Sequence, residues 1–128
     1  MIATIMLAKE PAANILIRSL IPIFTGFGRS ARFTPDILID DGYDLARFGY
    51  EARIISLPGH SKGSIGVLTP GGDLFCGDFL ENTKKPALNS LMDDPAAGEA
   101  SLARLKNLEI RNVYPGHGEP FLMDLLSN

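Results

Sequence analysis

The chain has 128 residues, of which 45% are hydrophobic and 21% charged, and its formal net charge is −3. This length and apolar content predict a single domain with one core. The 12 basic residues are scattered and give no concentrated positive surface, so we expect a partner that is neither nucleic acid nor a membrane.

The N-terminal quarter is apolar, yet it has the pattern of neither an export signal nor a membrane span. Residues 1–8 lack a basic start and a small-residue cleavage pattern, so no signal peptide is expected. Residues 10–21 predict a helix with proline at its first position. The apolar run 11–24 contains Arg18 and falls short of the roughly 20 apolar residues that cross a bilayer. A loop is predicted over 25–35.

Short β-like runs follow, separated by turn-forming glycine, proline and aspartate. They span residues 36–39, 52–57, 64–69 and 74–76, with turns at Asp41-Gly42, Pro58-Gly59 and Pro70-Gly71-Gly72. This spacing predicts a meander of neighbouring strands.

A second helix is predicted after the meander. Asp94 has the position of an N-cap and Pro95 that of the first helical residue, and leucines follow at three-residue spacing up to Leu108. One more strand is predicted over 110–114. Strands followed by a helix and a further strand predict a layered α/β fold with a mixed sheet.

Both histidines of the chain stand in the same tripeptide, Pro58-Gly59-His60 and Pro115-Gly116-His117. With 9 prolines and 13 glycines in 128 positions, chance places both there about once in twenty thousand sequences. Asp78, like the two histidines, follows a predicted strand and a glycine, which lets the backbone turn sharply and present a polar side chain. Two imidazoles and a carboxylate suit zinc, with iron or manganese as alternatives. Taken singly, each histidine is more often a surface residue, and Asp78 a turn residue.

The same motifs resemble those of the metallo-β-lactamase superfamily. Residues 58–64 (PGHSKGS) are similar to its third-histidine motif, Gly77-Asp78 to its bridging aspartate, and residues 115–118 (PGHG) to its last-histidine motif. Residues 36–42 resemble the strand and turn that precede the third-histidine motif. The order and spacing agree over roughly residues 36–121.

The resemblance implies part of an αβ/βα sandwich and a zinc-dependent hydrolase with two metals bridged by hydroxide. His60 would then bind the first metal, His117 the second, and Asp78 would bridge them and be the catalytic residue. The implied substrate is a small molecule with an ester, thioester or lactone-like carbonyl, although the superfamily is too diverse for the fold to specify it. A cytoplasmic location is expected, because the one cysteine, Cys76, excludes an intrachain disulfide.

The chain also departs from the superfamily pattern. No histidine precedes His60, so the first metal-binding motif of the superfamily, His-x-His-x-Asp-His, with its four ligands, is absent. We therefore expect residues 1–128 to be a single truncated domain, which a fragment, a shortened gene product or a misassigned start would each explain. Weak or no metal binding by the chain alone is expected. An apolar surface meant for the missing half predicts a homo-oligomer or a complementing N-terminal half as partner.

Two other functions compete with the metal hypothesis. Gly59-His60-Ser61-Lys62-Gly63 matches the Gly-x-Ser-x-Gly elbow of serine hydrolases, with Asp78 and His117 following in the matching order, but the β-like residues after Ser61 do not provide the helix that an elbow needs. A non-catalytic remnant or interaction module is the second alternative. Cys76 is interpreted as a small buried strand residue, and Lys84-Lys85 as a solvated loop.

Overall fold

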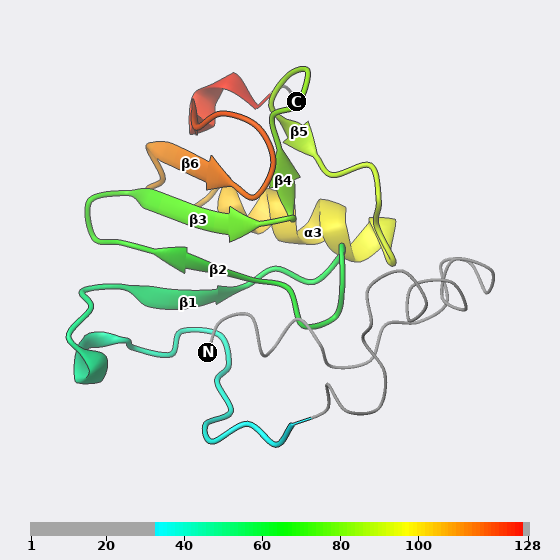
Figure 1. Cartoon of the computed structure of the whole chain (residues 1–128). Coiled ribbons are helices and arrows are strands. Elements are labelled where there is room, and N and C mark those ends of the chain that lie inside the picture. Colours follow the sequence, from blue (N-terminus) through cyan, green and yellow to red (C-terminus); the bar gives the residue numbers. More distant parts are fainter. Residues whose placement is uncertain (1–32, 127–128) are drawn as a thin grey trace.

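The computed structural model describes residues 33–126, and the helix predicted over 10–21 lies outside them. Within this part a five-stranded mixed sheet is covered on one face by a single α-helix, with a two-stranded sheet beside it (Figure 1). The large sheet contains β1 (Arg53–Ser56), β2 (Ile65–Leu68), β3 (Asp73–Gly77), β6 (Asn112–Pro115) and β7 (Phe121–Leu122), and the small one β4 (Leu80–Glu81) and β5 (Ala87–Leu88). The helix is α3 (Pro95–Leu105), and 3-10 turns lie at η2 (Ala46–Phe48) and η3 (Met123–Leu125).

The order of the strands gives three of them the same direction. The sheet runs β1-β2-β3-β6-β7, with β1, β2 and β3 antiparallel in turn and β6 parallel to β3. A parallel neighbour needs a long crossover, which here contains α3. Strands β1, β3 and β6 therefore all end at the same edge of the sheet.

The core lies between the sheet and α3. Strand pairing places Leu68, Leu74 and Val113 in one row across β2, β3 and β6, and this row packs with Leu102 and Leu105 of the helix in a single cluster. Gly98, Ser101, Leu102 and Leu105 are the buried residues of α3, at the spacing of one helical face.

The opposite face of the sheet is also apolar. Ile54, Val67, Phe75 and Tyr114 pair successively across β1, β2, β3 and β6 and so share this face. The rings of Phe75 and Tyr114 are stacked with their centroids 4.7 Å apart. Phe75 is nevertheless 48% exposed, whereas Ile54 is fully buried.

Most predicted elements are confirmed with small shifts in their ends. Strands occur within 52–57, 64–69 and around 74–76. Helix α3 begins at Pro95, and the Asp94 carboxylate accepts a hydrogen bond from the Ala97 amide. The helix ends at Leu105 because the amides of Asn107 and Leu108 bond three residues back and tighten the last turn.

The strand predicted over residues 36–39 is wrong, because these residues have no regular structure. The position beside β1 is taken by residues 42–45, since the Gly42 amide bonds to the Ile54 carbonyl and the Ile54 amide to the Tyr43 carbonyl. The strand predicted over 110–114 is present but begins at Asn112. None of the helices within residues 33–126 is long and apolar enough to cross a membrane.

An ion pair joins the first turn to the helix. The Arg104 guanidinium donates to both carboxylate oxygens of Asp41, at 2.5 and 2.6 Å, and Asp41 Oδ1 also accepts from the Ser56 amide at 2.8 Å. These bonds hold the pKa of Asp41 below its usual value of 3.8, with the hydrogen bond from Arg104 as the largest cause. The pair ties the end of β1 to α3.

Replacing Asp41 by asparagine should make the free energy of unfolding depend less on pH in the acid range. Because the pKa of Asp41 is lower in the folded than in the unfolded protein, ionisation of this carboxyl stabilises the fold. The full stabilisation is present above the pKa of the unfolded state, near 4, and it is lost as the pH falls through the pKa of the folded state. Because both side chains are nearly half exposed, we expect less than about 1 kcal/mol at pH 7. Urea unfolding between pH 2.5 and 7 measures the effect, with the exposed neighbour Asp40→Asn as control; identical pH profiles for both variants would contradict the prediction.

Candidate metal centre

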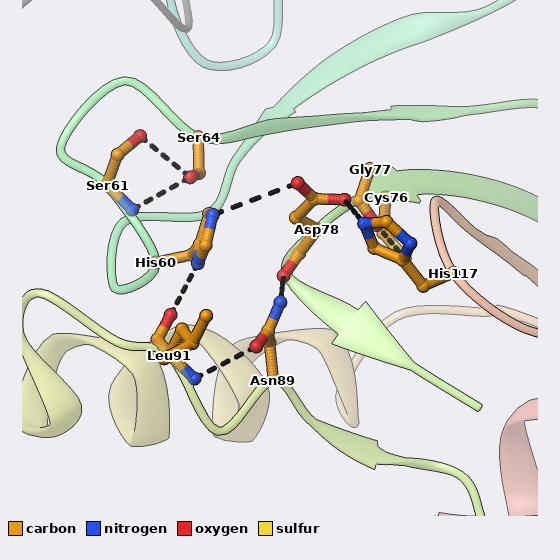
Figure 2. Close-up of polar contacts among 9 residues, drawn as sticks. All are labelled: His60, Ser61, Ser64, Cys76, Gly77, Asp78, Asn89, Leu91 and His117. Carbon is orange, nitrogen blue, oxygen red and sulfur yellow. Dashed lines mark hydrogen bonds and ion pairs between the residues drawn. The ribbon is translucent and has the colours of Figure 1, made fainter. Parts of the chain in front are cut away.

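The three residues predicted as metal ligands lie together at one edge of the sheet (Figure 2). Asp78 directly follows β3, and His117 lies two residues after β6. His60 follows the turn after β1. Because β1, β3 and β6 run in the same direction, residues that follow their carboxyl ends meet at this edge.

Asp78 lies between the two imidazoles and directs a different oxygen to each. Its Oδ1 is 3.3 Å from His117 Nε2, and its Oδ2 is 3.9 Å from His60 Nε2. The side chains are 64% exposed for His117, 38% for Asp78 and 25% for His60, so the cluster opens to solvent on the His117 side.

A hydrogen bond fixes the proton of His60. Its Nδ1 lies 2.5 Å from the carbonyl oxygen of Leu91. A carbonyl can only accept, so Nδ1 carries a proton, and in the neutral form of the ring the lone pair then lies on Nε2, which faces Asp78. A lone pair and a carboxylate oxygen that face each other across a gap form an arrangement that a cation between them would stabilise.

The donor set fits two metal positions in part. Two ligand atoms about 2.1 Å from one metal lie roughly 3 to 3.5 Å apart at tetrahedral or octahedral angles. The His117–Asp78 separation meets this condition, and the His60–Asp78 separation is a few tenths of an ångström wider. Each such position would have two protein ligands from these residues, whereas catalytic zinc usually has three. Over residues 33–126 no group of three or more histidine, cysteine or acidic side chains is arranged to hold one ion.

Glycines allow the close packing on which the site is built. A Cβ on Gly59, the residue before His60, would lie 2.5 Å from the Cα of Gly98 in α3. A Cβ on Gly116, the residue before His117, would lie 2.5 Å from Asp78 Oδ1. The repeated Pro-Gly-His motif therefore has a steric reason at both of its positions.

Gly116→Ala should impair the site more than the fold. The new methyl group would lie 2.5 Å from Asp78 Oδ1 and displace the carboxylate from His117, whereas its 3.2 Å contact with the Gly77 carbonyl asks for a shift of only a few tenths of an ångström between β3 and β6. We expect metal affinity to fall by about 10-fold or more, as for other changes beside ligands. Zinc titration against a competing chelator measures it, with Gly71→Ala as control because a Cβ there has only one neighbour, 3.8 Å away. Equal affinities in the two variants would contradict the prediction.

The serine-hydrolase alternative does not agree with the structure. Ser61 is 6% exposed, and its hydroxyl is hydrogen-bonded to that of Ser64 at 3.0 Å. The segment after it is β2 and not a helix, so the strand-turn-helix context of a nucleophile elbow is missing. Ser61 and Ser64 brace the turn that carries His60.

The interpretations of the cysteine and the lysine pair agree with the structure. Cys76 is 1% exposed within β3, and burial raises the pKa of its thiol to about 11, so it is protonated at neutral pH. Lys84 and Lys85 lie exposed in the bend between β4 and β5.

Sequence reasoning missed Asn89 and the backbone of Leu91. Asn89 directly follows β5 and is 8% exposed, and its amide contacts both Asp78 and Leu91. Both of its partners are main-chain atoms, so no motif signals them.

Known proteins resemble the chain in sequence and structure. A beta-lactamase-like protein 2 homolog from Caenorhabditis elegans is 31% identical over 81 residues, which are 62% of this chain and 26% of that protein. The solved structure of TTHA1623 in a di-iron-bound form is 29% identical with a TM-score of 0.54, covering 72% of this chain and 46% of that one. A metallo-beta-lactamase family protein from Thermus thermophilus is 25% identical with a TM-score of 0.58, covering 72% and 33%. No protein-family profile matches the chain.

A third solved structure leads to the same family. An archaeal metallo-beta-lactamase superfamily protein from Sulfolobus tokodaii is 26% identical with a TM-score of 0.51, covering 60% of this chain and 31% of that one. The chain therefore has part of the α/β fold of metallo-β-lactamase family proteins and is similar to them in sequence over that part. It spans 26% to 46% of the length of these relatives.

Proposed function

We propose that this chain supplies His60, Asp78 and His117 as ligands to a two-metal hydrolytic site, with zinc as the metal. The observation that carries the proposal is the placement of Asp78, which directs one oxygen toward each imidazole. A carboxylate in this position can bridge two cations, whereas a structural ion pair would need only one of the two histidines.

Each residue has a separate task in the proposed site. His60 holds one metal through Nε2, with its ring oriented by the Leu91 carbonyl. His117 would hold the other from the more exposed side, and Asp78 would offer one carboxylate oxygen to each position. Metals bound there would lower the pKa of coordinated water and polarise the oxygen of a carbonyl substrate.

The remaining ligands of the proposed site are not histidines of this chain. The chain has two histidines in all, and both are already assigned. A complementing N-terminal half is the proposed source, and a second copy of the chain could add only the same residues. Iron is the first alternative to zinc, because the related TTHA1623 was solved in a di-iron-bound form, and manganese is the second.

The proposed substrate is a small ester, thioester or lactone-like carbonyl compound. The net charge of −3 and the scattered basic residues favour a small neutral substrate over a nucleic acid. The proposed location is the cytoplasm, where a buried free thiol such as Cys76 persists.

Elemental analysis of protein purified without chelators tests the proposal. For the chain combined with a complementing N-terminal half, we expect zinc, iron or manganese to be retained and its stoichiometry to fall in His60→Ala and in His117→Ala, and hydrolysis of an ester, thioester and lactone panel to be abolished by a chelator. A folded, metal-free protein that gains no metal even with an added N-terminal half would overturn the proposal and support the non-catalytic interaction module. Labelling of Ser61 by a fluorophosphonate would instead support a serine hydrolase.

A further inference from the structure

A continuous series of hydrogen bonds connects His60 to Asp78 without passing through the space between their side chains (Figure 2). The Asn89 amide nitrogen donates to the Asp78 carbonyl at 2.9 Å. The Asn89 side-chain oxygen accepts from the Leu91 amide, also at 2.9 Å. The carbonyl of Leu91 in turn accepts from His60 Nδ1.

We propose that Asn89 is a positioning residue that couples the orientation of His60 to that of Asp78. This inference rests on the proposed function, because the two residues it aligns are the proposed ligands. Asn89 suits this role because its side-chain nitrogen and its side-chain oxygen are both hydrogen-bonded. The residue is also buried, with an exposed fraction of 8%. Serine or alanine at this position would satisfy fewer main-chain groups.

The surrounding structure holds Asn89 on one side of Leu91, and on the other side the Asp94 amide bonds to the Gly59 carbonyl at 3.0 Å and the Asp93 amide to the His60 carbonyl at 3.4 Å. The backbone amide of Asn89 bonds to the Phe79 carbonyl, which continues the pairing of β4 with β5. The Leu91 side chain is 74% exposed and provides little packing to fix its own peptide group. The bond from Asn89 to the Leu91 amide is therefore the side-chain bond that completes the placement of this segment, whose carbonyl accepts from His60 Nδ1.

This coupling affects the metal-facing nitrogen directly. With Nδ1 protonated, Nε2 keeps its lone pair for a cation; with the proton on Nε2, the ring could not bind a metal from that side. Loss of Asn89 would remove the bond on the N-terminal side of Leu91, so that the Leu91 carbonyl shifts relative to His60 Nδ1 and the ring can rotate or change its tautomer. It would also leave the carbonyl of Asp78 without its amide donor.

Two measurements on Asn89→Ala test the inference. In metal-free protein at mildly alkaline pH, imidazole nitrogen-15 shifts should report the Nδ1–H tautomer for His60 in the parent and a mixture in the variant. The chain has two histidines, so His117→Gln assigns the signals. Zinc affinity measured against a competing chelator should fall roughly 10- to 100-fold.

Asn112→Ala is the matched control. Asn112 also donates a side-chain amide bond, to Asp73 Oδ1 at 2.8 Å, but at the start of β3 and β6, away from the site. We expect it to leave the tautomer unchanged and zinc affinity within about twofold, so that a general loss of stability is distinguished from loss of positioning. If Asn89→Ala does not fold, Asn89→Ser replaces it with the same expected results.

The outcomes separate this inference from the proposed function. An unchanged His60 tautomer in the folded variant, or an Nε2–H tautomer in the parent, would overturn the role of Asn89. Unchanged zinc affinity in the variant would do the same. If the parent binds no metal but Asn89→Ala alters the tautomer, the proposed function fails while the coupling by Asn89 stands.

Discussion

Asp78→Ala is expected to abolish metal binding at both positions, whereas His60→Ala and His117→Ala should each abolish binding at one. Asp78 is the residue whose two oxygens face the two imidazoles, at 3.9 and 3.3 Å, so its removal leaves each position with a single described ligand. We expect an affinity loss of roughly 100-fold or more, larger than for changes beside ligands. Moles of metal per mole of protein after dialysis measure the difference.

Folding should be retained in these three variants, because the side chains are partly exposed and pack little of the core. Circular dichroism and urea unfolding provide the control for each variant. Should all three bind metal as the parent does, His60, Asp78 and His117 are not its ligands.

Gly59→Ala is expected to be the most destabilising of the substitutions considered. A Cβ at this residue would lie 2.5 Å from Gly98 Cα and 2.8 Å from Gly98 N, which are backbone atoms of α3 that cannot move without shifting the helix. The φ of Gly59 is also +149°, in the range that glycine favours. Clash and strain together predict a fall in the free energy of unfolding of about 3 kcal/mol or more.

Gly49→Ala is the matched control for that prediction. Its φ is +86°, yet a Cβ there would meet nothing within 4 Å, so it has backbone strain without the clash. We expect a loss of about 1 kcal/mol. Urea unfolding curves compare the two variants. Equal losses in the free energy of unfolding would show that Gly59 is not required because of its close approach to Gly98.

Elements with a local cause could be predicted from the sequence. The start of α3 follows from Asp94 and Pro95, whose cap and fixed φ act within a few residues. The strands of the meander follow from apolar runs between turns. The two Pro-Gly-His motifs and Gly77-Asp78 indicated a common site, and the structure brings these side chains together, while their role as ligands stays a prediction.

Features that depend on distant partners could not be predicted. Residues 36–39 have strand-forming side chains, but Leu38 is 81% exposed and the place beside β1 is occupied by residues 42–45. Strands β4, β5 and β7 are two residues long, too short to show a period. The role of Asn89 depends on the carbonyl of Asp78, eleven positions earlier in the chain.

The parallel pairing of β3 with β6 has a consequence for how such a chain can change in evolution. Gly77 pairs with Pro115, so the spacing of Asp78 and His117 is set by strand register and not by the number of residues that separate them. Insertions or deletions in the exposed bend at residues 83–85 would leave that spacing intact. A one-residue insertion within β6 would turn the following side chains to the opposite face and separate the pair. Relatives can therefore differ widely in the length of this crossover while keeping the same arrangement at the edge of the sheet.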